Sequence, residues 1–179
     1  MSSVLAGLAL MQAASGAPTP EELKGQPILS CASPMHAAFD FWVGEWDVFH
    51  AGSEEKVADS TIERTHGGCA VIENWKPLNG RGGTSLNHFD ANTGEWHQKW
   101  MGTGPHAVEF TGGPTVSGMV ITGYWRDYVG QGRSAWVRMT YSRNEDGSVR
   151  QFGEASVDYG VTWNASFDLL YRPKATDTD

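Results

Sequence analysis

The sequence contains few cysteines, few basic residues and no long apolar run. Cys31 and Cys69 are its two cysteines, and without a Cys-x-x-Cys or Cys/His cluster we expect no metal site. Lys and Arg number 13 against 21 Asp and Glu, and the net charge of -8 argues against nucleic acid or an anionic membrane surface as a partner. The apolar stretch at residues 4–14 is too short to cross a bilayer, so we expect no stable membrane insertion.

Motifs of the common catalytic classes are also missing. The sequence has no Gly-x-Ser-x-Gly nucleophile elbow, no phosphate-binding loop, no dinucleotide fingerprint and no His-Glu-x-x-His zinc motif. Any chemistry would therefore depend on ordinary acid–base side chains, and we expect no cofactor.

Glycine and aromatic residues are plentiful, in a pattern typical of short strands. The 22 Gly and 8 Trp suit strands joined by tight turns better than helices. Residues 90–94 and 144–147 have the composition of hairpin turns. The predicted strands are 41–50, 56–65, 69–76, 84–90, 95–101, 107–111, 119–125, 135–142, 149–157 and 162–172. We predict an all-β fold, a single antiparallel up-and-down barrel of about ten strands, because closure removes the exposed edges.

We predict that the chain divides into a leader at residues 1–33, which is a possible remnant of an export signal, a barrel at 34–173 and a disordered tail at 174–179. Thr19-Pro20-Glu21-Glu22 has the pattern of a helix start, and Ser33-Pro34 predicts a second short helical turn before the barrel. Residues 4–17 are typical of the apolar core and cleavage zone of an export signal, although no Lys or Arg precedes them. We expect a periplasmic or secreted protein; a cytoplasmic protein with a disordered tail is the alternative.

The two cysteines bear on the same question. In an oxidising compartment, Cys31 and Cys69 form an even pair that can bridge. The alternative is two buried thiols that never meet.

Four segments carry a resemblance to a known family. They are FDFWVGEWDV (39–48), GGCAVIENW (67–75), SLNHFDANTGEWHQKW (85–100) and GSVRQFGEASVDYGVTW with FDLLYR (147–172). In this order they resemble the DUF1579 type, a family of uncharacterised and often exported bacterial lipocalin-like proteins. The resemblance implies a lipocalin-like (calycin-like) barrel and no assigned reaction. The Gly-x-Trp of the first segment is also similar to nitrobindin-like barrels, which bind haem through a late histidine. The last histidine here is His106, so we expect no haem.

Alternation along the strands predicts which side chains face the barrel interior. Val71, Glu73 and Trp75 share one face of the strand at 69–76, and placing the large indole inward carries Glu73 with it. Burial beside indoles is expected to raise the pKa of Glu73, whereas a neighbouring Arg would lower it.

The same argument gives the full set of candidate site residues. The predicted ligand-binding residues are Trp46, Glu73, Trp75, Asn87, Gln98, Trp100, Arg138 and Glu154. The predicted catalytic residues are Glu73, Arg138 and Tyr141. Each has a structural alternative, because a buried carboxylate and an Arg can simply pair and tryptophans can simply pack. His88 and His97 oppose Asn87 and Gln98 along the strands, so we expect them outside.

Three functions fit these observations. The first is a monomeric or homodimeric barrel that binds a small hydrophobic or amphipathic molecule. The second is a cofactor-independent lyase, isomerase or decarboxylase that acts on a small aromatic or terpenoid substrate, with Glu73 as the acid or base. The third is a solidly packed barrel that serves as an assembly module.

Overall fold

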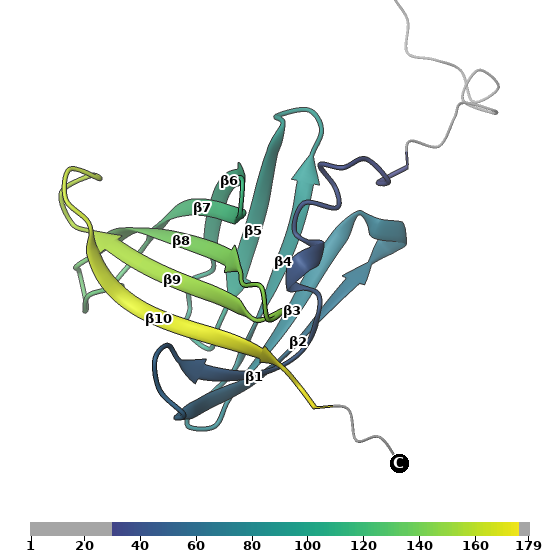
Figure 1. The fold of residues 1–179 in the computed structure, drawn as a ribbon. Coiled ribbons are helices and arrows are strands. Elements are labelled where there is room, and N and C mark those ends of the chain that lie inside the picture. The colour runs from purple at the N-terminus through teal and green to yellow at the C-terminus, as the bar shows by residue number, and fades with distance from the viewer. Residues whose placement is uncertain (1–29, 176–179) are drawn as a thin grey trace, which may run out of the picture.

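A computed structural model describes residues 30–175 as one closed antiparallel barrel of ten strands (Figure 1). The strands are β1 (Gly44–His50), β2 (Lys56–Thr65), β3 (Ala70–Pro77), β4 (Gly83–Asp90), β5 (Glu95–Met101), β6 (Val108–Pro114), β7 (Gly118–Trp125), β8 (Ala135–Arg143), β9 (Val149–Ser156) and β10 (Asn164–Pro173). Each strand pairs with the next in sequence, and β10 pairs with β1 to close the barrel. The predicted fold class is therefore confirmed.

Short 3-10 helices are the only helical elements among the described residues. They are η1 (Asp40–Trp42) and η2 (His66–Gly68). The first strand begins at Gly44, later than predicted, because η1 occupies the residues before it. Within residues 30–175, no helix has the length and apolar character needed to span a membrane. The predicted helix start at Thr19 lies outside the described residues.

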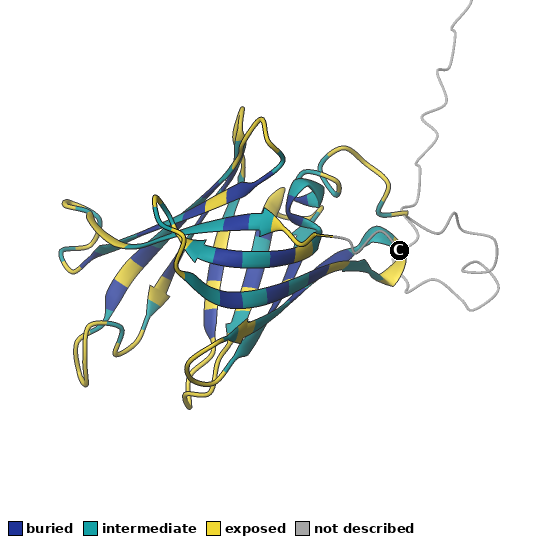
Figure 2. Cartoon of the chain, turned by 60° about the horizontal axis from the view of Figure 1, so that its bottom comes forward, coloured by how far each residue is buried: buried dark blue, intermediate teal, exposed yellow. Residues whose placement is uncertain are grey.

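Buried and more exposed residues alternate along most of the strands, as the colours in Figure 2 show. On β8, Val137, Met139 and Tyr141 are buried, whereas Arg138 and Thr140 between them are only partly buried. This alternation follows from the period of two in a β-strand, and it produces an interior lined by alternate residues.

One end of the barrel, here called the closed end, is filled by the residues before β1. The rings of Phe39 and Trp42 are almost completely buried, and each has its centroid 4.9 Å from that of Tyr141. Trp46 is also buried here, and its indole N–H donates to the carbonyl oxygen of Trp42 at 3.0 Å. The opposite end, where the β3–β4 and β9–β10 loops lie, is called the open end.

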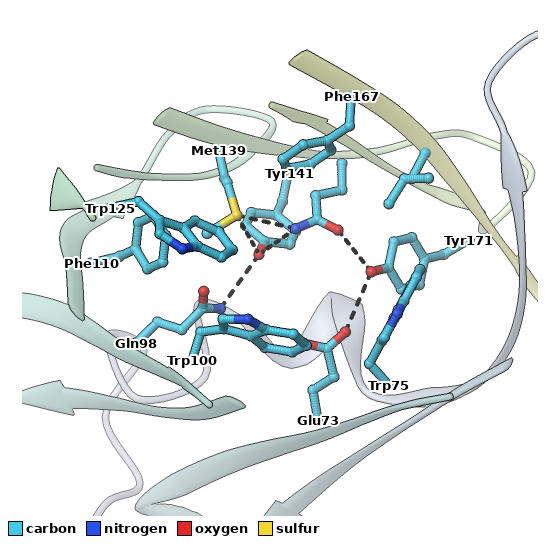
Figure 3. Close-up of a pocket in the computed structure, with 12 residues that line it drawn as sticks. Glu73, Trp75, Gln98, Trp100, Phe110, Trp125, Met139, Tyr141, Phe167 and Tyr171 are labelled. Atoms are coloured by element: carbon cyan, nitrogen blue, oxygen red, sulfur yellow. Dashed lines mark hydrogen bonds between the residues drawn. The ribbon is translucent and has the colours of Figure 1, made fainter. Parts of the chain in front are cut away.

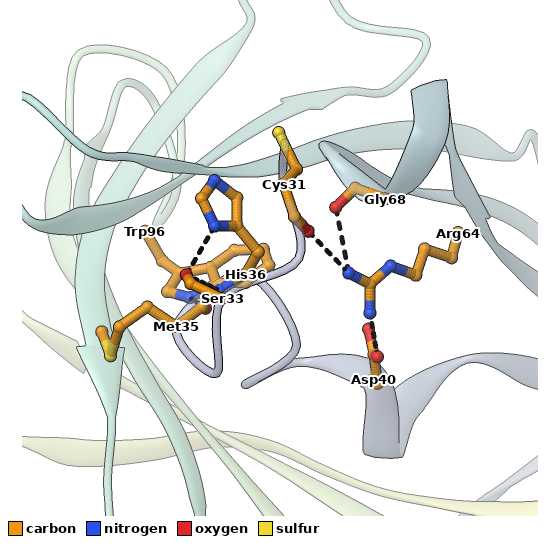
Figure 4. Close-up of polar contacts among 8 residues, drawn as sticks. All are labelled: Cys31, Ser33, Met35, His36, Asp40, Arg64, Gly68 and Trp96. Atoms are coloured by element: carbon orange, nitrogen blue, oxygen red, sulfur yellow. Dashed lines mark hydrogen bonds and ion pairs between the residues drawn. The ribbon is translucent and has the colours of Figure 1, made fainter. Parts of the chain in front are cut away.

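A disulfide and several polar contacts hold the N-terminal segment on the closed end, and Figure 4 shows the polar contacts. Cys31 is bridged to Cys69, as predicted for an exported chain. The Arg64 guanidinium pairs with Asp40 and donates to the carbonyl oxygens of Cys31 and Gly68. These contacts fix the direction in which the chain enters η1.

Candidate ligand-binding cavity

A cavity of about 140 Å³ lies inside the barrel, between the aromatic residues of the closed end and the open end. Figure 3 shows its lining, in which aromatic rings predominate. The lining residues are Glu73, Trp75, Gln98, Trp100, Phe110, Trp125, Met139, Tyr141, Gln151, Phe167, Leu169 and Tyr171. Apolar walls with a few convergent polar groups are typical of small-molecule sites.

Two glycines in the wall make room for neighbouring rings. Phe167 is paired directly with Gly153 across β10 and β9, and a Cβ at Gly153 would lie only 2.2 Å from the Phe167 ring. Likewise, a Cβ at Gly83 would lie 2.5 Å from the Trp100 indole. Both rings therefore lie directly against glycine backbone, in space that the Cβ of any other residue would occupy.

Glu73 supplies the carboxyl group of the cavity. It lies in the middle of β3 and is 5 % exposed. Its Oε2 accepts from the Ser85 hydroxyl at 2.9 Å, and its Oε1 accepts from the Ser60 hydroxyl at 3.3 Å. Burial raises the pKa of Glu73 to about 7, and the hydrogen bonds from Ser85, Ser60 and Tyr171 oppose that rise only in part. Glu73 is thus able to exchange a proton near neutral pH.

Buried amides continue the polar network along β4 and β5. The Asn87 amide donates to the Ser85 hydroxyl at 3.0 Å and to the carbonyl oxygen of Val71 at 2.9 Å. The Gln98 amide donates to Asn87 Oδ1 at 2.7 Å and to the Tyr141 hydroxyl at 3.4 Å. These bonds connect the Glu73 side of the barrel with β8.

Two tyrosines and a glutamine complete the network on the other side. The Gln151 amide N–H donates to the Tyr141 hydroxyl at 2.9 Å, and the Tyr171 hydroxyl lies 2.7 Å from Gln151 Oε1 and 3.4 Å from Glu73 Oε1. Burial and the nearby Glu73 carboxylate raise the pKa of both tyrosines, so both hydroxyls keep their protons. The closed circuit that results, here called the polar ring, consists of Glu73, Ser85, Asn87, Gln98, Tyr141, Gln151 and Tyr171.

Most of the predicted site residues come together at this cavity. Glu73, Trp75, Gln98, Trp100 and Tyr141 all line it, and Glu73 faces inward as its alternation with Trp75 predicted. Trp75 and Trp100 are half-buried rather than fully buried, because their rings form its wall.

The other predicted interior residues lie elsewhere. Asn87 is buried in the polar ring but does not line the cavity, and Trp46 packs at the closed end. Arg138 and Glu154 do not face the interior, so their predicted placement is wrong. They lie opposite each other on the outer face of β8 and β9, where they form an ion pair at 2.9 Å, and Arg138 also lies over the Trp163 ring.

The physical reason for this error is the phase of the alternation on β8 and β9. Arg138 stands next to Val137 and Met139, whose side chains face inward, so its own side chain points outward. Arg138 therefore cannot join Tyr141 in one site.

Sequence reasoning missed the remaining lining residues. They are Phe110, Trp125, Met139, Gln151, Phe167, Leu169 and Tyr171. Alternation contained the signal for several of them: Phe167, Leu169 and Tyr171 share one face of β10, and Gln151 shares a face with the buried Val149.

The described residues offer no obvious metal site. Between residues 30 and 175, no three His, Cys, Asp or Glu side chains are grouped to hold an ion. His88 and His97 stack on each other across β4 and β5, with ring centroids 5.2 Å apart. They alternate with the buried Asn87 and Gln98, so they lie on the outer face, as predicted.

The architecture, a closed antiparallel barrel with an internal cavity, is consistent with a calycin-like fold. No family model matches the chain, and no curated protein matches it in sequence. The functional argument therefore depends on the geometry of the cavity.

Proposed function

We propose that this protein binds a small amphipathic molecule inside its barrel. The observation that supports the proposal is the combination, in one cavity, of aromatic walls and the buried Glu73 carboxyl group. The apolar part of the ligand would lie between rings such as Trp100 and Phe167. Its polar part would face the polar ring, where hydrogen-bonding groups are already oriented.

The size of the cavity limits the size of the ligand. A buried apolar cavity of about 150 Å³ accommodates benzene. The 140 Å³ cavity is of this size, so it suits a molecule with one six-membered ring and a small substituent. A larger ligand requires the side chains at the open end to move.

Binding can be tested with the intrinsic fluorescence of the tryptophans in the wall. We expect single-ring aromatic compounds to change the emission of Trp75, Trp100 and Trp125 on titration, and native mass spectrometry of protein purified without refolding to show any co-purified ligand. Glu73→Gln is the informative variant. Glu154→Gln is its matched control, because it removes the same charge from the outer face. If single-ring compounds leave the emission unchanged at millimolar concentration, the cavity is not a binding site.

A second candidate is a cofactor-independent enzyme that transfers protons, such as a lyase, an isomerase or a decarboxylase. The specific observation in its favour is the pKa of Glu73, about 7, which suits a general acid or base at neutral pH. Arg138 cannot assist, because its side chain points to the outer face of the barrel. Glu73 and Tyr141 remain as the candidate catalytic residues. In this case Glu73→Gln should preserve binding and reduce turnover by about a hundredfold or more. In the carrier case there is no turnover to lose, and the variant should instead change how ligand binding depends on pH.

We also infer the family, the location and the assembly of the protein. The segments that resemble the DUF1579 type run through several strands of the barrel, which supports membership of that family. The Cys31–Cys69 bridge supports a periplasmic or secreted location, where disulfides persist. We propose a monomer or homodimer that binds neither nucleic acid nor membranes stably. Size-exclusion chromatography with light scattering tests the assembly, and cell fractionation tests the location.

A further inference from the structure

The direction of the hydrogen bonds in the polar ring can be deduced from one hydroxyl group. Tyr171 has a single hydroxyl proton but two acceptors, Gln151 Oε1 at 2.7 Å and Glu73 Oε1 at 3.4 Å. The shorter contact takes the proton. The longer contact is then a hydrogen bond only if Glu73 itself carries a proton and donates it to Tyr171. The arrangement suits a protonated, neutral Glu73 that donates to the Tyr171 oxygen.

The same direction continues from Tyr171 to Tyr141. Because Gln151 accepts from Tyr171 through Oε1, its amide nitrogen faces Tyr141 and donates to that hydroxyl oxygen at 2.9 Å. Gln98 donates to the same oxygen from the other side. Tyr141 therefore already accepts two hydrogen bonds, and its own proton remains to be placed.

That proton has only a weak acceptor among the described residues. The Met139 sulfur lies 3.7 Å from the Tyr141 hydroxyl oxygen, and a thioether accepts poorly. Both residues line the cavity, as Figure 3 shows. A buried donor without a good partner is costly, and a ligand that supplies an acceptor removes that cost.

We propose that Tyr141 determines ligand specificity by donating its hydroxyl proton to an acceptor such as the carbonyl of an uncharged single-ring ligand, and that ionisation of Glu73 withdraws this donor. The inference depends on the proposed function, since it names the ligand class of the same cavity. A neutral ligand follows from the neutral Glu73 and from the absence of any Lys, Arg or His among the described residues that line the cavity.

Ionisation would act through reversal of the hydrogen bonds. An ionised Glu73 requires the Tyr171 proton for itself, and the Gln151 amide must then rotate so that its nitrogen donates to Tyr171. The Gln151 oxygen would then face Tyr141 and accept a hydrogen bond from its hydroxyl group. Tyr141 could then no longer donate to the ligand.

Among the described residues that contact Glu73, none carries a charge that would balance its ionisation. The titratable groups near Glu73 are Tyr171 from β10 and Tyr141 from β8. Strands β2 and β4 contribute Ser60 and Ser85, which are uncharged, and β9 contributes the neutral Gln151.

The test uses acetophenone and α-methylstyrene, two probes of the same shape that differ by a carbonyl oxygen in place of a methylene group. At about pH 5.5, we expect the wild-type protein to bind acetophenone about tenfold more tightly than α-methylstyrene, the scale of one hydrogen bond. Tyr141→Phe should abolish that preference. At about pH 8.5 the wild-type preference should fall, whereas Glu73→Gln should keep it, because a Gln amide donates to Tyr171 as a protonated Glu73 does.

Each outcome separates this inference from the proposed function. If neither probe binds, the cavity does not take a single ring and the proposed function fails. If both bind equally well to wild type and to Tyr141→Phe, the cavity binds ligands but Tyr141 does not select them. If benzylammonium binds more tightly than acetophenone, and more so as the pH rises, the site selects cations through an ionised Glu73, and the inference is overturned.

Discussion

The buried carboxyl group of Glu73 should make the stability of the protein depend on pH. Its pKa is about 7 in the folded state and near the ordinary value of 4.5 in the unfolded chain, so between these values the folded state holds a proton that the unfolded state has lost. Stability is then fully present below about pH 4.5 and falls as the pH rises to about 7. The two pKa values correspond to a loss of about 3 kcal/mol across this window.

The variant Glu73→Gln removes this titration while keeping the size and hydrogen bonding of the side chain. The difference in unfolding free energy between wild type and Glu73→Gln should therefore shift by about 3 kcal/mol in favour of the variant from about pH 4 to pH 8. Urea denaturation with the disulfide intact measures it, and Glu154→Gln, on the outer face, should leave the wild-type loss in place. A difference that stays constant with pH would show that Glu73 is accessible to water.

Three further outcomes are expected. Gly153→Ala should push the Phe167 ring into the cavity, because the new Cβ would lie 2.2 Å from it; the change should cost about 1–3 kcal/mol in a denaturation experiment and weaken binding of ring compounds. Replacing Cys31 and Cys69 together by Ser should lower the free energy of unfolding by roughly 3–4 kcal/mol. In the wild-type protein, thiol titration under denaturing, non-reducing conditions should find no free thiol. Protein isolated from its host should show neither a Soret band nor stoichiometric iron, and either one would contradict the expectation of a cofactor-free barrel.

The sequence alone was sufficient for the fold but only partly for the site. Hairpin turns and strand-length runs of residues predict an up-and-down order of strands. This works because each strand pairs with the next one in the sequence, so the pairing depends on local signals. Glu73 was also accessible to this reasoning, since Trp75 on the same strand indicates which face is inward. Arg138 was misplaced because an Arg on an alternating strand was read as interior, although its neighbours Val137 and Met139 face the core.

The polar ring was beyond the reach of the sequence for a different reason. Its bonds join residues far apart in the chain, such as Glu73 and Tyr171, and no local pattern specifies which side chains meet across a barrel. Gln151 shows the difficulty, because alternation places it inside but says nothing of its partners.

The pairing of β1 with β10 also has a consequence for how the protein is made. The bridged cysteines both lie within the first 69 residues, whereas Tyr171 belongs to the last strand. The disulfide can therefore form before β10 pairs with β1 and closes the barrel. Until β10 docks, β1 and β9 are open edges and Glu73 remains in contact with water as an ionised group. Between about pH 4.5 and 7, insertion of the final strand therefore draws a proton onto Glu73, and acidic conditions should favour that last step of assembly.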